Sequence, residues 1–350
     1  MMRFSFALLV LFLFSFNLFG QPKKDSIAED MLIVQRINGG WPKHLQIRGK
    51  KDVKTNYAGL NLTSEERQNI KGDSAKLNTT YDNDATSKEI RHLLQAYVET
   101  GNKNYLQAAE KGIEYILSGQ YPSGGWPQFY PLKGGYADDI TYNDNAMVNC
   151  LNVLRDLVRS EQGFDVVDDQ LRQKSKIALA KGVECILKTQ ILINGELTVW
   201  CAQHDPLTFK ATNARSFELA SLSGQESVGI IRFLMEIENP SEEVKNSIEQ
   251  AMMWIDANKI EGYKIIWPEA PGTERGYDRV LVEAPGSVLW ARFYDLETGK
   301  PFFCGRDGVK KQSMTEIEYE RRVGYGWYGT WPEKLLNDYY PEWKKQNRLD

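Results

Sequence analysis

GGWPKH, residues 39–44, is the first of four related motifs in which a tryptophan follows small or apolar residues and precedes proline or cysteine. The other three are GGWPQF at 124–129, TVWCAQH at 198–204 and IIWPEA at 265–270. Their tryptophans, at positions 41, 126, 200 and 267, are 85, 74 and 67 residues apart. Repetition on this scale is typical of stacked supersecondary units.

A polar motif follows each of the first three tryptophan motifs. The first two copies are TYDNDA at 80–85 and TYNDNA at 141–146. After the third tryptophan come NARS at 213–216 and LSGQES at 222–227. We therefore expect each unit to consist of a polar loop followed by two helices.

The segments between these motifs carry apolar residues at helical spacing. Within 85–100, for example, Ile90, Leu93 and Leu94 fall on one stripe. The expected helices are Ser26–Ile37, Ala85–Thr100, Tyr105–Ser118, Ala146–Arg159, Asp168–Thr189, Gln225–Glu238 and Ser241–Asn258. Helical hairpins repeated in this way can close into an (α/α) toroid whose loops surround one mouth.

After Lys259 the helical period is lost, and short aromatic and β-branched segments alternate with Gly and Pro. These segments predict short strands at Tyr263–Trp267, Val280–Glu283, Leu289–Tyr294 and Phe302–Cys304. A last helix is expected at Trp331–Tyr339. No low-complexity linker interrupts the chain, so we expect residues 21–350 to form one mainly α domain, an (α/α) toroid of helical hairpins with long loops and a few short strands.

Residues 1–20 have the pattern of a secretory signal peptide. Arg3 precedes an apolar run from Phe4 to Phe19, and a polar segment follows at once. A transmembrane anchor is the alternative, but the run is shorter than the roughly 20 residues that a membrane-spanning helix needs. We therefore expect cleavage after Gly20 and a mature protein that is secreted or periplasmic and not attached to a membrane.

The composition disfavours several classes of function. The net charge is −4, from 43 basic and 47 acidic residues, whereas a general nucleic-acid binder usually carries a basic excess. The three histidines share no ligand spacing, which disfavours a zinc site. The four cysteines are far apart, and we expect them to be buried free thiols. Nothing in the sequence indicates an obligate oligomer, so we expect a monomer.

Aspartates gather in the polar loops of the first two units. They are Asp82, Asp84, Asp138, Asp139 and Asp144. Carboxylates and Asn side chains without nearby thiols or imidazoles suit a hard cation, calcium or magnesium. The alternative is that these residues cap helices. We expect capping to be the role of most of them, with one or two left for function.

Arg215, Arg292 and Arg306 each lie among small, apolar or aromatic residues. Burying an arginine there is costly without an anionic partner, and its planar guanidinium suits carboxylates. An internal salt bridge is the alternative for each. Tryptophans in loops with Gly or Pro add faces on which sugar rings stack. The better candidates are Trp41, Trp126, Trp327 and Trp331. A groove with arginines, hard-metal carboxylates and aromatic faces is typical of a protein that binds acidic polysaccharides.

Seven motifs, in the same order along the chain, resemble those of the pectate lyases of polysaccharide lyase family ten. They are GGWPKH, TYDNDAT, SGGWPQFYP, TYNDNAM, LSGQES, ARFYDLETGKPFFCGRDG and ERRVGYGWYGTWP. The similarity runs from about Gly39 to Trp331. The resemblance implies an (α/α) toroid that cleaves polygalacturonate by calcium-assisted β-elimination and releases 4,5-unsaturated oligogalacturonates.

The resemblance also implies roles for individual residues. Arg306, in GRDG, would be the base that removes the C5 proton. Asp144, in TYNDNAM, would be a calcium ligand. Asp82, in TYDNDAT, would be a second essential acid close to the calcium and the scissile bond. Arg215 and Arg292 would hold substrate carboxylates.

The implied chemistry is physically coherent. The proton leaves a carbon next to a carboxylate, a weak acid, so positive charge must stabilise the enolate-like transition state. An arginine base needs neighbouring cations and desolvation to lower its pKa, which ordinarily lies so far above neutral pH that the side chain stays protonated. Two alternatives stay open: a glycoside hydrolase with Asp82 and Asp144 as acid and base, and a non-catalytic protein that binds an acidic polysaccharide.

Overall fold

The computed structural model describes residues 23–47 and 50–348. The predicted signal peptide, residues 1–20, lies outside this part of the chain. Within it, no helix has the length and apolar character needed to cross a membrane.

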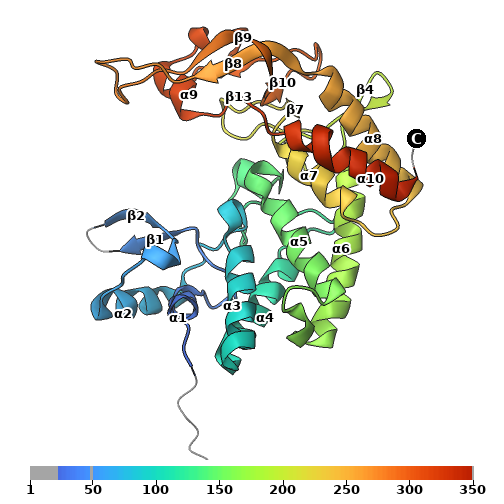
Figure 1. Ribbon diagram of the computed structural model, residues 1–350. Helices are drawn as coiled ribbons and strands as arrows, with labels where there is room; N and C mark the ends of the chain where they lie inside the picture. The colour runs from blue at the N-terminus through green and yellow to red at the C-terminus, as the bar shows by residue number, and fades with distance from the viewer. Residues whose placement is uncertain (1–22, 48–49, 349–350) are drawn as a thin grey trace, which may run out of the picture.

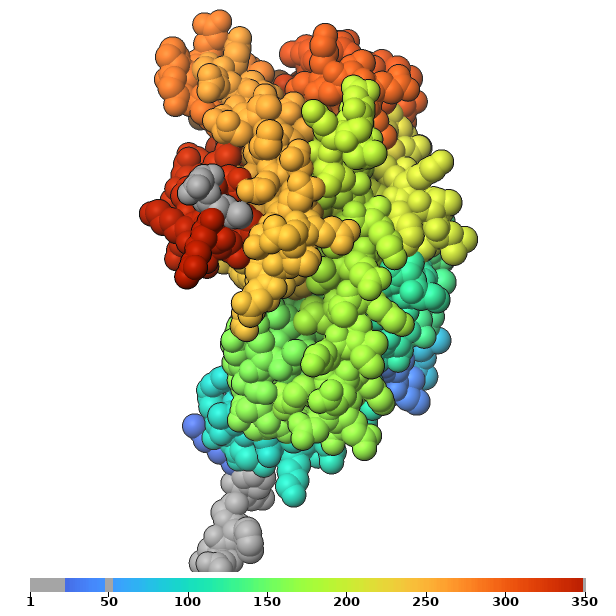
Figure 2. All heavy atoms as spheres, turned by 90° about the vertical axis from the view of Figure 1, so that its right-hand side faces the viewer, coloured from blue at the N-terminus to red at the C-terminus, as the bar shows by residue number. Residues whose placement is uncertain are grey.

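Three helical hairpins lie side by side in one row (Figure 1). The helices of this row are α1 (Ser26–Val34), α3 (Ser87–Thr100), α4 (Lys103–Ser118), α5 (Ala146–Arg159), α6 (Asp169–Thr189), α7 (Glu226–Met235) and α8 (Glu242–Ala257). Helix α3 packs on α4, α5 on α6, and α7 on α8, while α1 packs on the first hairpin. Along one side α3, α5 and α7 contact one another in turn; along the other, α4, α6 and α8 do so, and Figure 2 shows α6 and α8 on the outer surface. The mainly helical fold is confirmed, and closure of the row into a toroid stays a prediction.

Four buried tryptophans join loops to helices in the same way. Each indole N–H donates to a main-chain carbonyl of an earlier helix: Trp41 to Met31 at 2.9 Å, Trp126 to Ile116 at 2.7 Å, Trp200 to Ile186 at 2.8 Å and Trp290 to Ile255 at 2.8 Å. A buried indole N–H needs such a partner. The repeated tryptophan therefore fixes each loop to the outer helix before it.

The fourth tryptophan of this series is Trp290, so the prediction that it is Trp267 was wrong. Trp267 follows a strand and is 57% exposed. The same turn follows Trp200 and Trp290, and this supports the correction. Thr208 donates to Asp205 through its backbone N–H and its hydroxyl, at 2.6 and 2.9 Å. Thr298 donates to Asp295 in the same way, at 2.8 and 3.0 Å.

The glycines of the GGWP motifs allow the loop to approach the outer helices closely. Gly39 has φ +90° and Gly124 has φ +95°, a region that L-residues rarely adopt. A Cβ atom at these positions would collide with the carbonyl oxygens of Lys111 and Lys181, respectively. The motif thus needs glycine for a steric reason.

The strands lie mainly in the C-terminal third. The longest sheet has the order β13 (Tyr328–Gly329), β9 (Val280–Ala291) and β8 (Ile260–Ile266), all antiparallel. The antiparallel two-stranded pairs are β1 (His44–Ile47) with β2 (Lys50–Lys54), β3 (Ile140–Thr141) with β6 (Gln203–His204), β4 (Leu192–Ile193) with β5 (Glu196–Leu197), β7 (Leu222–Ser223) with β10 (Phe293–Tyr294), and β11 (Phe303–Cys304) with β12 (Lys310–Lys311). The predicted strand region is confirmed, although two predicted strands are parts of one longer β9.

Three more helices occur in the part of the chain that the structure describes, and all three differ from the sequence-based expectation. They are α2 (Ser64–Gly72), α9 (Tyr319–Gly324) and α10 (Tyr340–Asn347), the last preceded by a π-helical turn at Leu335–Tyr339. Helices α2 and α9 and the β1–β2 hairpin were not expected. The predicted last helix at Trp331–Tyr339 begins later and continues into α10.

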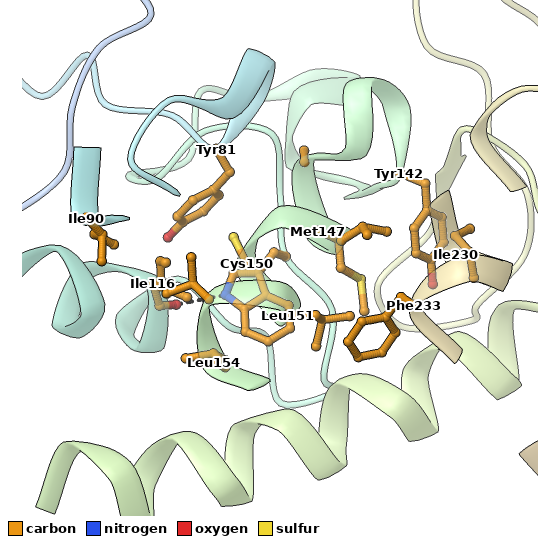
Figure 3. Close-up of a cluster of buried hydrophobic side chains, with 14 of the residues drawn as sticks. Tyr81, Ile90, Ile116, Tyr142, Met147, Cys150, Leu151, Leu154, Ile230 and Phe233 are labelled. Carbon is orange, nitrogen blue, oxygen red and sulfur yellow. Dashed lines mark hydrogen bonds between the residues drawn. The ribbon is translucent and has the colours of Figure 1, made fainter. Parts of the chain in front are cut away.

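The main hydrophobic core lies between the hairpins and the repeated loops. Figure 3 shows Tyr81 and Tyr142, one from each loop, on either side of Met147 and Cys150 of α5. The Tyr81 hydroxyl donates to a carbonyl of α4 at 3.0 Å, and the Tyr142 hydroxyl lies 2.7 Å from the hydroxyl of Thr189. All four cysteines are buried free thiols, as expected.

Candidate functional site

The two repeated polar motifs meet at the start of α3 and α5 and line one cavity of about 170 Å³. Their backbones are nearly the same: Asn83 has φ 52° and ψ 47°, and Asp144 has φ 51° and ψ 29°. The residues after them, Asp84 and Asn145, also have positive φ, 61° and 59°. Asn and Asp tolerate this left-handed conformation better than other L-residues. The alternation of Asn and Asp in both motifs therefore has a backbone cause as well as a chemical one.

Asp82 is a buried carboxylate on the wall of this cavity, only 1% exposed. Its Oδ2 is paired with the Lys43 ammonium and accepts from Gln128 Nε2 at 2.9 Å. Its Oδ1 accepts from Asn83 Nδ2 at 2.8 Å. A buried carboxylate is tolerated only with such partners, so Asp82 is held in one orientation.

Asp144 lines the same cavity and accepts from Asn143 Nδ2 at 2.9 Å. Loss of hydration raises the pKa of Asp144, and the negative charge of Asp82 raises it further. Arg292 acts in the opposite direction, and Glu226 adds to the increase. An added cation would stabilise the ionised form of Asp144, because it would offset the negative charge of its neighbours.

Arg292 supports the second motif from outside the set of residues that line the cavity. It is 7% exposed, is paired with Glu226, and donates to Asn143 Oδ1 at 3.0 Å. Its guanidinium carbon lies 4.5 Å from the ring centroid of Tyr325. Burial is the largest single effect and acts to lower the pKa of Arg292. The charges of Glu226 and Tyr325 and the hydrogen bond to Glu226 act together in the opposite direction, and the pKa rises.

Arg215 lines the cavity and is paired with Glu218 through two hydrogen bonds of 2.7 and 2.5 Å. Its guanidinium carbon is 5.0 Å from the centroid of the Phe217 ring. That of Arg306 is 4.3 Å from the same ring. Arg306 therefore contacts the same ring as Arg215, which lines the cavity. Arg306 itself is not among the described residues that line the cavity.

Arg306 is half exposed and paired with Glu320, with Nε 2.5 Å and Nη2 3.2 Å from its carboxylate oxygens. Its backbone N–H donates to the carboxylate of Glu318 at 3.1 Å. The hydrogen bond with Glu320 is the main cause that raises the pKa of Arg306, while the charge of Arg215 acts to lower it. The net direction is opposite to what a base requires.

Two partners of Asp82, Lys43 and Gln128, were missed by the sequence analysis. A signal was present: each stands two residues after a repeated tryptophan. Ala202 and Arg292 occupy the same position in the third and fourth copies. The first three line the cavity, and Arg292 contacts it through Asn143. In every unit, therefore, the residue two positions after the repeated tryptophan lines the cavity or contacts a residue that lines it.

The expected aromatic faces are not available at three of the four predicted positions. Trp41 and Trp126 are fully buried, and Trp327 is 1% exposed in a second, smaller core. Trp331 is half-buried and packs against Gly329. The prediction for the first three was wrong because Gly and Pro beside them allow close packing rather than exposure.

The oxygen atoms of the cavity fit a hard cation. Within the part of the chain that the structure describes, no three His, Cys, Asp or Glu side chains gather as an all-protein metal cage. The carboxylates of Asp82 and Asp144 are present, and Gln128 Oε1 is buried without a hydrogen-bond partner among the described residues. Oxygen donors of this kind suit calcium, with water and ligand oxygens completing its coordination.

The fold and the site define a helical-hairpin protein with paired carboxylates and arginines around one cavity, the combination expected of an enzyme for acidic polysaccharides. The family model for pectic acid lyase matches residues 35–336. The chain belongs to the pectic acid lyase family and is a polysaccharide lyase.

Two solved structures from Cellvibrio cellulosa are similar to this chain. One is a family 10 polysaccharide lyase, 36% identical, with a TM-score of 0.76, covering 89% of this chain and 90% of its own. The other is an aspartate-to-alanine mutant of a family 10 polysaccharide lyase in complex with trigalacturonic acid, 36% identical, with a TM-score of 0.77 and coverage of 89% and 91%. No curated protein matches the chain.

Proposed function

We propose that this protein is a calcium-assisted pectate lyase that cleaves α-1,4-polygalacturonate by anti β-elimination. The observation that carries the proposal is the meeting of Asp82, Asp144 and Arg215 around one cavity. The resemblance assigns all three to this chemistry, and they come from motifs far apart in the sequence. The similar lyase structure in complex with trigalacturonic acid adds support for the substrate class.

Asp82 and Asp144 would hold the calcium ion, with the free Gln128 Oε1 as a further oxygen donor. A bound calcium ion would neutralise the uronate carboxylate and so make the proton on C5 more acidic. Lys43, paired with Asp82, keeps a second positive charge at the same wall.

The elimination removes a proton from C5, breaks the C4–O4 bond and protonates the leaving oxygen. The neutral guanidine of Arg306 would take the proton from C5, the C5–H electrons would form the C4–C5 double bond, and the C4–O4 bond would break. The leaving O4 then takes a proton from solvent. Because the pairing with Glu320 raises the pKa of Arg306, the base role requires that Arg306 leave Glu320 when substrate binds.

Arg215 is the arginine better situated to hold a substrate carboxylate, because it lines the cavity and is half exposed. Arg292 is engaged with Glu226 and Asn143. Its assignment as a carboxylate-holding residue stays a prediction, and its contacts favour a role in fixing the second motif.

The expected setting completes the proposal. We propose that residues 1–20 are removed as a signal peptide, that residues 21–350 act as one catalytic domain, and that the mature monomer works outside the cytoplasm. Size-exclusion chromatography and N-terminal sequencing of the exported protein test these points directly.

The function is tested by the ultraviolet absorbance of unsaturated uronate in mature protein incubated with polygalacturonate. Absorbance should grow with calcium and stop with a chelator. Arg306→Ala should lower kcat by about 10³-fold or more while substrate binding persists. New reducing ends without absorbance would instead indicate hydrolysis, and wild-type turnover in Arg306→Ala would remove the proposed base.

A further inference from the structure

A second and larger cavity adjoins the candidate active site. Its volume is about 770 Å³, and Lys43 lines both cavities. Asn83 and Asp84 of the first repeated motif form part of its wall, and Lys54 of β2 and Lys88 of α3 form another part. The elements around it, α1, β1, β2 and α3, lie together in Figure 1. We call this cavity the Lys54 groove.

The Lys54 groove is positively charged in a protein whose net charge is −4. Three lysines and one aspartate line it, together with His44 and His92. The aspartate, Asp84, accepts from Asn149 of α5 at 2.7 Å. His92 is paired with Asp25 at 3.0 Å. Lys54 forms no ion pair with another described residue, so its charge is available to a ligand.

Lys88 lies where the helix dipole disfavours a cation, and the carboxylate of Glu89 compensates for this only in part. It lies in the first turn of α3, where the helix dipole is positive and favours negative charge. Its ammonium is 3.8 Å from the carboxylate of Glu89, which is buried, and 3.5 Å from the hydroxyl of Thr55. A carboxylate in the groove would meet both the lysine and the helix terminus.

The groove also offers an apolar surface for a sugar ring. Tyr57 and Met31 line it, and both are buried residues of the main core. Apolar walls with a few convergent charges are typical of saccharide and other small-ligand sites. A neutral glycan would leave Lys54 without a charged partner, whereas a uronate chain carries one carboxylate on each ring.

We propose that the Lys54 groove binds galacturonate units of the substrate chain distal to the scissile bond, with Lys54 and Lys88 contacting their carboxylates. This inference rests on the proposed function. It predicts that the groove contributes to binding of long chains and contributes nothing to a trisaccharide held at the Asp82 and Asp144 cavity.

The test compares two substrate lengths in a Lys54→Gln/Lys88→Gln variant. KM for polygalacturonate should rise about 3- to 10-fold with kcat unchanged, and the increase should shrink at high salt. Kinetics on trigalacturonate should not change. The matched control is Lys174→Gln/Lys176→Gln, which removes the same charge from exposed positions of α6. Lys54→Gln alone, at the exposed end of β2, guards against a loss of folding at α3.

Equal KM values for wild type and variant on the long substrate would overturn the proposal, as would an equal loss on both lengths. Calorimetry separates this result from a failure of the proposed function. The wild type could form no unsaturated product and still bind pentagalacturonate more tightly than trigalacturonate. If the variant then loses that difference, the result supports the proposed groove and refutes the lyase mechanism. Equal binding of both lengths by the wild type would overturn the groove.

Discussion

The two polar motifs at 80–85 and 141–146 share one backbone and divide the chemistry between them. Each starts with a buried Thr-Tyr pair and contains two residues with positive φ. In the first motif the carboxylate facing the cavity is Asp82, before the left-handed residues; in the second it is Asp144, on a left-handed residue itself. The two motifs thus have the same backbone but carry Asp and Asn at exchanged positions. Each motif presents one carboxylate to the cavity, and the two carboxylates come from different positions of the motif.

The cations behind the two motifs differ for the same reason. Asp82 is negative and takes Lys43 directly. Its equivalent, Asn143, is neutral, so Arg292 behind it needs a separate carboxylate, which Glu226 supplies. Both cations stand two residues after a repeated tryptophan. The comparison indicates that the two motifs share one backbone but carry different charged residues. In each of them the cation is paired with a carboxylate.

Among changes within the two motifs, the largest effect is expected from removing the carboxylate of the second. Asp144→Asn should lower kcat on polygalacturonate by about 10²- to 10³-fold, because one electrostatic group at a reacting centre is worth roughly that much. Asn tolerates the left-handed backbone, so the fold should persist. The measurement is the initial rate of unsaturated uronate formation at saturating calcium.

The control for this change is Asp84→Asn in the first motif. It makes the same chemical change at another left-handed residue, whose carboxylate accepts from Asn149. Activity should change less than about threefold, since no role in the elimination falls on it. A loss as large as that of Asp144→Asn would show that the two motifs contribute carboxylates symmetrically, contrary to the comparison.

A smaller effect, on stability, is expected behind the second motif. Glu226→Gln leaves the Arg292 cation buried without a compensating charge and should lower the free energy of unfolding by about 3 kcal/mol. Urea denaturation followed by tryptophan fluorescence measures it. Lys43→Gln should cost about 1 kcal/mol, because Asp82 keeps Gln128 and Asn83 as donors. Equal losses of unfolding free energy for Glu226→Gln and Lys43→Gln would contradict this expectation, because it rests on the different burial of the Arg292–Glu226 and Lys43–Asp82 pairs.

The helical part of the fold could be predicted because hydrophobic spacing and end signals agreed. Helix α5 has the predicted bounds, and α3 ends at Gly101 in the left-handed conformation typical of a helix terminus. Helix α2 was missed because it is polar, with Ile70 as its one buried residue. The β1–β2 hairpin was missed because β2 carries three lysines and neither strand has an apolar alternation of useful length.

The site could be predicted only in part. The resemblance and the charged motifs pointed to Asp82, Asp144 and Arg215, which share the cavity. Lys43 and Gln128 were missed because Trp267 was predicted to be the fourth repeated tryptophan. The position two residues after the tryptophan is equivalent in all four units only when Trp290 is the fourth. The partner of Arg306 was hidden too, since Glu320 follows 14 residues later and no spacing rule joins a loop to α9.

The last predicted effect depends on pH and concerns the helices that follow the two motifs. Glu89, at the start of α3, accepts from the Thr86 N–H at 2.6 Å, and burial raises its pKa to about 7; the equivalent residue of α5 is Cys150. Below its ordinary pKa of 4.5 the Glu89 carboxyl is neutral in both states. As pH rises to 7 the unfolded chain ionises first, so folding stability falls, by about 2 to 3 kcal/mol in total. Glu89→Gln should therefore match the wild type in urea at pH 4 and exceed its stability at pH 8. Cys150→Ala should lose the same amount at both pH values, and a Glu89→Gln difference that did not grow with pH would refute the assignment.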